Sequence, residues 1–160
     1  MSQTPNALTA LLEQAEKARD EAISQFENGR KAHEVARQQL QSLHDFRQDY
    51  QQRWQHQFRQ ASGMEIMRSY QDFMTRLSEA QAEQQSRLEQ ALSHLERCRA
   101  MLIERERKVA AVTKLMQRRA GENALKEQRR DQKATDETAS RLHASNRGGP
   151  MSAMPASSPP

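Results

Sequence analysis

Apolar residues recur every seven positions in the second half of the chain, on two rows separated alternately by three and four residues. One row holds Leu88, Leu95, Leu102, Val109 and Met116, and the other holds Leu77, Ala91, Cys98 and Val112. On an α-helix this average spacing of 3.5 residues produces a narrow apolar stripe, which a supercoiled partner helix can bury along its whole length. Neither Gly nor Pro occurs within residues 64–120. The pattern therefore predicts one arm of a coiled coil.

The first half of the chain repeats this pattern in a weaker form. Its first row holds Leu8, Ala15, Ala22, Gly29, Ala36, Leu43 and Tyr50, and its second row holds Leu12, Phe26, Leu40 and Trp54. Arg19, His33 and Arg47 interrupt the second row. Small residues let two helix backbones approach closely, and long polar residues in a seam fix the register of the helices at a cost in stability. Thr4 and Pro5 suit the start of this helix, as its cap and its first residue.

The two patterns meet at residues 61–63, where Gly63 is expected to end the first helix in the left-handed conformation. A connection this short makes the two helices antiparallel. The predicted fold class is therefore all-α, a long antiparallel two-helix coiled coil (an αα-hairpin) over residues 5–143. We expect helix one at about 5–61, the turn at 62–64 and helix two at about 65–143. The Gly, Pro and Ser content of residues 144–160 predicts a disordered tail.

The two predicted arms differ in length. At 1.5 Å per residue they measure roughly 85 Å and 120 Å. Residues 121–143 are therefore expected to project beyond the paired region as a single helix. Their apolar pattern thins there, and an isolated helix of this kind is only marginally stable in water. This segment is expected to need a partner.

Composition and charge fit a coiled coil and leave one question open. Of 160 residues, 35% are hydrophobic and 29% are charged, which is typical of a long helix rather than a domain with a thick core. Basic residues concentrate between positions 97 and 119, although the net charge is only +4. This stretch is either a solvated helix face or a positive collar for an acidic partner. Because signal-peptide and membrane-spanning patterns are missing, we expect a cytoplasmic protein.

The sequence offers little chemistry for catalysis. It has no Gly-rich phosphate loop, and a two-helix rod provides no pocket that could hold a catalytic triad. His94 and Cys98 have a spacing that can place two metal ligands on one helix face, but two further ligands are not evident, and Cys98 is expected to be a buried seam thiol. We therefore expect no enzyme, metal, cofactor or small-molecule substrate. The basic stretch is interspersed with heptad positions and lies apart from the aromatic residues, so we also expect no nucleic acid partner.

Aromatic residues are scarce but gather around the predicted turn. The group consists of Phe46, Tyr50, Trp54, Phe58, Tyr70 and Phe73. Tyr50 and Trp54 are suited to a small core at the tip of the hairpin. Two helices cannot enclose six rings, so part of the group is expected to be available to a partner.

Three segments resemble the FliJ family of flagellar type III export proteins. They are residues 40–50 (LQSLHDFRQDY), residues 70–77 (YQDFMTRL) and residues 127–137 (EQRRDQKATDE). Lys114 and Leu115 lie between the second and third segments. The order and spacing of these segments carry the resemblance, which extends from about Leu8 to Arg141.

The resemblance implies a coiled-coil stalk at the cytoplasmic face of the inner membrane, at the base of the flagellum. It implies that the stalk binds the pore of the hexameric flagellar export ATPase, promotes its assembly and activity, and links it to the export gate, a membrane protein. The residues expected to bind the ATPase are Arg129, Arg130, Asp131, Gln132, Lys133, Asp136 and Glu137. Those expected to bind the gate are Tyr70, Phe73 and Leu77, although Leu77 also opens the second seam. The alternatives are a chaperone or escort for flagellar substrates, with export chaperones as further partners, and a generic scaffold that dimerises through its second helix.

Overall fold

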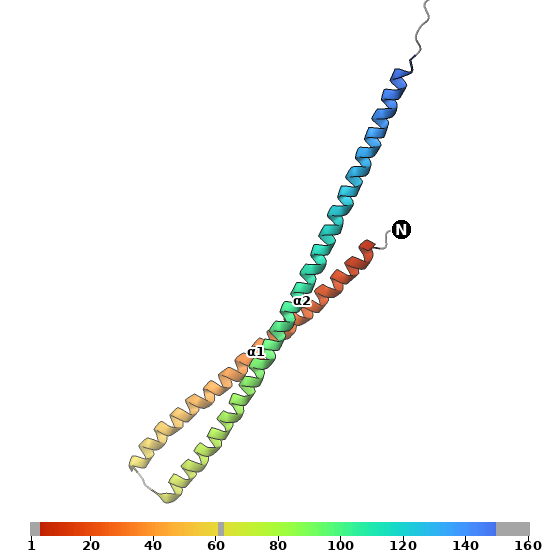
Figure 1. The fold of residues 1–160 in the computed structure, drawn as a ribbon. Helices are drawn as coiled ribbons and strands as arrows, with labels where there is room; N and C mark the ends of the chain where they lie inside the picture. Colours follow the sequence, from red (N-terminus) through yellow and green to blue (C-terminus); the bar gives the residue numbers. More distant parts are fainter. Residues whose placement is uncertain (1–3, 61–62, 150–160) are drawn as a thin grey trace, which may run out of the picture. The chain divides into compact units, whose positions relative to one another are not determined.

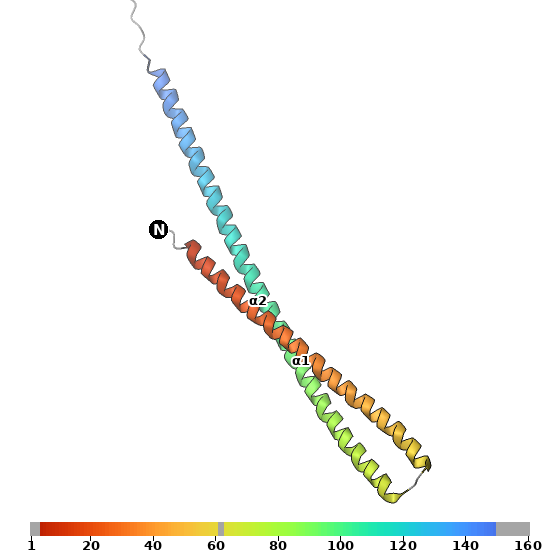
Figure 2. The same ribbon diagram turned by 180° about the vertical axis from the view of Figure 1, so that it is seen from behind.

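A computed structural model describes residues 4–60 and 63–149 of the chain (Figures 1 and 2). These residues form two helices, α1 at Thr4–Gln60 and α2 at Met64–Arg147, and they include no strand. The predicted all-α fold of two long packed helices is confirmed. The chain divides into two units, Met1–Val112 and Thr113–Pro160, and each is described by itself below.

The first unit is an antiparallel pair made by α1 and the first part of α2. Near the turn, the ring of Phe46 lies 6.1 Å from that of Phe73, measured between centroids. Farther from the turn, Gly29 of α1 lies against Leu95 of α2. Residue numbers therefore fall along α1 as they rise along α2, which is the direction that Figure 1 shows.

The core of this pair is a thin seam of small and medium-sized side chains. No described residue is both large and completely buried. The buried apolar residues are Ala15, Ala22, Ala36 and Leu40 of α1, and Leu77, Cys98 and Val112 of α2. All of them occupy the heptad rows that the sequence pattern assigned to the seam. Burial between two helices therefore accounts for the pattern, as expected for a coiled coil.

Small residues in the first row of α1 let the two backbones come close together. A Cβ atom added at Gly29 would lie 3.6 Å from His94 Cδ2 and 3.7 Å from Leu95 Cα. These are ordinary van der Waals distances, so the space on this side of Gly29 is already filled by α2. The close approach that the small row predicted is confirmed at this position.

A polar layer interrupts the apolar seam. Gln81 and Gln84 of α2 are each 7% exposed, and both lie on heptad rows. Arg47 Nη1 donates a hydrogen bond of 2.9 Å to Gln81 Oε1, and Gln81 Nε2 lies 3.2 Å from His44 Nδ1. Gln84 Nε2 donates to the backbone oxygen of Ala36 at 3.1 Å. Because a shift of one helix along the other would break these bonds, the layer fixes the register of the hairpin.

The turn differs from the sequence expectation for Gly63. No described glycine has a positive φ, and the carbonyl oxygen of Gly63 accepts a 3.2 Å hydrogen bond from the Met67 backbone N–H. Gly63 therefore caps the start of α2, and the expected left-handed end of the first helix is wrong. The reason is that α1 already ends at Gln60, so Gly63 is not the residue that directly follows the first helix. Residues 61 and 62, which the sequence assigned to helix one and the turn, lie outside the described residues.

The second unit contains the rest of α2, from Thr113 to Arg147. Every residue from Gln117 to Gly149 is exposed. The helix runs four residues beyond the expected end at 143, and residues 150–160 of the expected tail lie outside the described residues. Among the described residues, no helix is both long enough and apolar enough to cross a membrane.

Candidate functional site

The aromatic residues near the turn form one cluster that joins the two helices. Tyr50 lies at its centre, with its ring centroid 4.2 Å from that of Phe73, 5.8 Å from that of Trp54 and 6.0 Å from that of Tyr70. Phe58 adds an edge contact to Tyr70 at 5.5 Å. These five rings are half-buried, so the cluster both holds the helices together and presents ring surface to solvent.

The three residues expected to bind the export gate differ in what they can contact. Leu77 is only 6% exposed and belongs to the seam, so it can act on a partner only by supporting its neighbours. Tyr70 and Phe73 are half-buried and keep some ring surface free. The structure adds Phe46, which is 50% exposed and lies beside Phe73. Phe46 also borders a recess of about 790 Å³ that Val35, Leu43, Gln84 and Arg87 help to line.

The residues expected to bind the ATPase all lie on the exposed part of α2. At 3.6 residues per turn, Arg129, Arg130 and Lys133 share one face with Asp136 and Glu137. Gln132 lies at the edge of that face and lines a shallow recess with Arg129, Arg130, Lys133 and Asp136, whereas Asp131 lies on the far side of the helix. None of the basic side chains between Thr113 and Arg147 forms an ion pair within the described part of the chain. The structure therefore brings six of the seven candidates to one side of the helix and separates only Asp131 from them.

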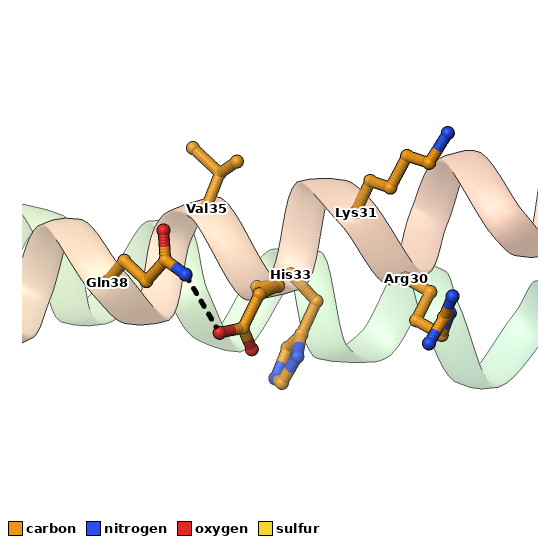
Figure 3. Close-up of a pocket in the computed structure, with 6 residues that line it drawn as sticks. Arg30, Lys31, His33, Val35 and Gln38 are labelled. Atoms are coloured by element: carbon orange, nitrogen blue, oxygen red, sulfur yellow. Dashed lines mark hydrogen bonds between the residues drawn. The ribbon is translucent and has the colours of Figure 1, made fainter.

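A second recess, of about 540 Å³, lies on the outer side of α1 (Figure 3). Its lining residues are Arg30, Lys31, His33, Glu34, Val35 and Gln38. The Glu34 carboxylate accepts hydrogen bonds from Arg37 at 2.8 and 3.0 Å and from Gln38 at 3.0 Å. Hydrogen bonding from Arg37 holds the pKa of Glu34 below its ordinary value. Because the recess is formed by one helix and its carboxylate is already engaged, it is a dip between side chains rather than an enclosed pocket.

The pair formed by His94 and Cys98 has no further metal ligands beside it. Cys98 Sγ lies 3.5 Å from His94 Nε2, and Cys98 is 6% exposed, as its seam position predicts. The described residues contain no group of three or more His, Cys, Asp or Glu side chains that could hold a metal ion. The contact is that of a seam thiol with the histidine one turn before it.

A family model described as "Flagellar FliJ protein" matches residues 4–148 of the chain. The chain belongs to the FliJ family. No curated protein and no solved structure matches it. The match confirms the resemblance seen in the sequence and makes the chain a component of flagellar protein export.

The FliJ match spans the aromatic cluster and the exposed part of α2, so both candidate contact regions lie inside it. In this FliJ chain the two regions fall in different units, which means that each can be altered separately. Sequence reasoning placed Phe46 in the aromatic group but not among the candidate residues for a gate contact. The signal that could have found it is its position beside the seam rows, where a large ring cannot be buried by one partner helix.

Proposed function

We propose that this FliJ-family chain is a non-enzymatic stalk that binds the pore of the hexameric flagellar export ATPase, promotes its assembly and activity, and links it to the export gate. The observation that carries the proposal is the run of α2 from Gln117 to Arg147, which is helical although none of its side chains is buried. A helix without packing gains little stability in water. The presence of such an exposed helix in an export component favours a role in binding another protein.

The proposed ATPase contact is the face that carries Arg129, Arg130 and Lys133, with Asp136 and Glu137 beside them. These cations are exposed and have no ion-pair partner among the described residues, so binding to the ATPase does not require existing ion pairs to break. Replacing Arg129, Arg130 and Lys133 with Ala is expected to weaken ATPase binding while leaving helicity, measured by circular dichroism, unchanged. Unchanged binding would remove this assignment.

The proposed gate contact is the exposed part of the aromatic cluster, formed by Phe73, Tyr70 and Phe46. Leu77 is buried in the seam and supports these rings. Phe46→Ala and Phe73→Ala are expected to weaken binding to the purified cytoplasmic part of the gate. Phe46 is half exposed, so its replacement should leave the unfolding midpoint nearly unchanged. If Phe73→Ala lowers the midpoint and leaves gate binding intact, then Phe73 is a core residue only.

The first experiment follows phosphate release by the organism's own export ATPase as the purified chain is added. We expect stimulation that disappears when residues 121–143 are deleted and persists when residues 150–160 are deleted instead. Stimulation by both deletion variants would place the contact outside residues 121–143. No stimulation by the full chain, with an ATPase of demonstrated activity, would contradict the proposed function and favour a scaffold or a chaperone.

A scaffold that dimerises through α2 is distinguished by mass. Light scattering at several concentrations should give a particle near 18.5 kDa for the proposed hairpin and about twice that for a dimer. An escort for export substrates is distinguished by competition, because its substrate and the ATPase would displace each other from the chain.

A further inference from the structure

The two seam rows of α2 change their chemistry along the helix. Up to Val112 and Met116 they carry mainly apolar residues, and afterwards they carry mainly basic ones. The row of Leu77, Cys98 and Val112 continues at intervals of seven with Arg119, Lys126 and Lys133. The row of Leu95, Leu102, Val109 and Met116 continues with Asn123, Arg130 and Glu137. Since α2 is one unbroken helix over these residues, the rows keep their helical positions.

The basic residues of these rows form a compact face. Lys126, Arg130 and Lys133 are spaced i, i+4 and i+7, which places them on successive turns of one side of the helix. Arg129 lies beside them, and Arg119 lies two turns before Lys126. Glu122 and Glu137 share this side of the helix, so the face is mainly but not wholly basic. All are exposed and none forms an ion pair within the described part of the chain. We call Arg119, Lys126, Arg130 and Lys133 the basic seam.

The opposite face carries no cation over the same turns. Ala124, Gln128 and Thr135 lie there, all exposed. A helix that lies on a membrane needs an apolar face opposite its charges, and this face does not supply one. Binding to single-stranded nucleic acid relies on stacking against aromatic rings, and residues 113–147 contain no Phe, Tyr or Trp. The arrangement therefore favours a protein partner.

The charges also restrict what kind of protein surface can pair with this segment. A second copy of the chain would set mainly cations against cations at the seam, because four of the six row positions from 119 to 137 are basic and only Glu137 is acidic, and this is unfavourable. An apolar helix would remove those cations from water without compensation. A surface rich in Asp and Glu satisfies them by charge-assisted hydrogen bonds.

We propose that the basic seam docks onto an acidic surface of the export ATPase, in place of the apolar packing that the same rows provide in residues 64–112. This inference rests on the proposed function and deepens it in two ways. It adds Arg119 and Lys126 to the contact, and it places Asp131, on the far side of the helix, outside the contact.

The test compares two variants of the full chain that change its net charge equally. The seam variant carries Lys126→Gln, Arg130→Gln and Lys133→Gln. The opposite-face variant carries Ala124→Glu, Gln128→Glu and Thr135→Glu, so each variant loses three positive units. Binding to the purified ATPase is measured by fluorescence anisotropy at about 50 mM and about 300 mM salt, and circular dichroism confirms equal helicity.

The seam variant is expected to bind at least about tenfold more weakly at low salt, and the opposite-face variant to stay within about twofold of the unchanged chain. The affinity of the unchanged chain should fall with salt more steeply than that of the seam variant. Both results together support the basic seam.

Other results would overturn it, and they separate it from the proposed function. If the unchanged chain binds and the seam variant binds equally well, the proposed function stands and the basic seam is wrong. If both variants lose affinity equally, net charge rather than this face governs binding. If the unchanged chain does not bind an active ATPase, both proposals fail. Seam-dependent binding to anionic phospholipid vesicles or duplex DNA would then identify the other class of partner.

Discussion

Residues 64–112 and residues 113–147 belong to the same helix, α2, and follow the same seven-residue rows, but the rows carry different side chains. In the first segment Leu77 and Val112 are buried, at 6% and 7% exposure. In the second, Lys126 and Lys133 occupy the same row and are exposed. The first segment gains its stability by burying apolar surface against α1, whereas the second has only intrinsic helix propensity to rely on.

This difference shows that helix formation and the chemistry of the seam are encoded separately along α2. The helical pattern continues through both segments, and the chemistry of the seam decides what can pack against it. Internal charge pairing follows the same division. The four ion pairs found among the described residues all lie within residues 19–87, and the cations of residues 113–147 remain unpaired. The cations of the second segment are therefore open to ion pairing with another molecule.

The largest difference between the two regions is expected when one leucine in each is replaced by alanine. Leu40 is 8% exposed in the seam, and Leu125 is 48% exposed on α2. Leu40→Ala should lower the free energy of unfolding by about 2–5 kcal/mol, because it removes apolar contacts and leaves a cavity. Leu125→Ala should change it by less than about 0.5 kcal/mol. Urea unfolding followed by circular dichroism measures both. Equal losses would mean that residues 113–147 are packed in solution as the hairpin seam is.

A smaller effect is expected in the polar layer of the hairpin. Gln81→Ala leaves the Arg47 guanidinium without its acceptor in a partly buried place, which should destabilise the hairpin by about 1–3 kcal/mol. Gln85→Ala is the control, because Gln85 is exposed and bonds only to Glu89 on the next turn of the same helix. Its effect should stay within about 0.5 kcal/mol. If both variants behave alike in urea unfolding, then the Gln81 bonds contribute nothing to the pairing of the helices.

A still smaller effect is expected at the two described glycines that lie within helices, Gly29 in the hairpin and Gly121 in the exposed part of α2. A methyl group at Gly29 would meet α2 at van der Waals distance, and one at Gly121 would meet nothing within 4 Å. Each Gly→Ala change favours the helix by about 0.5–1 kcal/mol. For Gly29→Ala this should raise the unfolding midpoint of the hairpin. For Gly121→Ala it should slow amide hydrogen exchange in residues 113–147 and leave the midpoint unchanged. A lower midpoint for Gly29→Ala would show that the helices lie too close for a methyl group.

How far the sequence could predict this molecule depends on the range of each signal. The seam was predictable because a period of seven is local, and Cys98 and Leu77 are buried where it placed them. The polar layer was only partly predictable. Arg47 was expected to act on the register, but its acceptor Gln81 lies 34 residues away and looks like any other polar interruption of a row. The position of Gly63 at the cap of α2 depended on where α1 stops, which composition does not fix.

The residues expected to bind the ATPase were also only partly predictable from the sequence. Residues 127–137 were chosen as one block because they resemble the family there, and a block in sequence covers all sides of a helix. On the helix, Arg130 and Lys133 lie on a different side from Asp131. The resemblance of the segment to the family does not reveal this separation. Helical phase therefore refines the candidate site, and the identity of the partner surface lies beyond what one chain contains.

The smallest expected effect concerns the exposed pair of Glu34 and Arg37 in the hairpin, whose atoms approach to 2.8 Å. Hydrogen bonds from Arg37 lower the pKa of Glu34 in the folded chain. A lowered pKa stabilises the fold above the ordinary pKa of Glu and loses this contribution as pH falls through the lowered value. Glu34→Gln should therefore reduce the unfolding midpoint slightly near pH 7 at low salt, and the difference should shrink as the pH falls below the ordinary pKa of Glu and vanish at about 1 M salt. Thermal unfolding of both proteins under the three conditions measures it. A difference that persists at high salt would show that Glu34 acts through packing rather than charge. The ion pairs of the hairpin would then not differ from the free charges of the basic seam in their electrostatic contribution to stability.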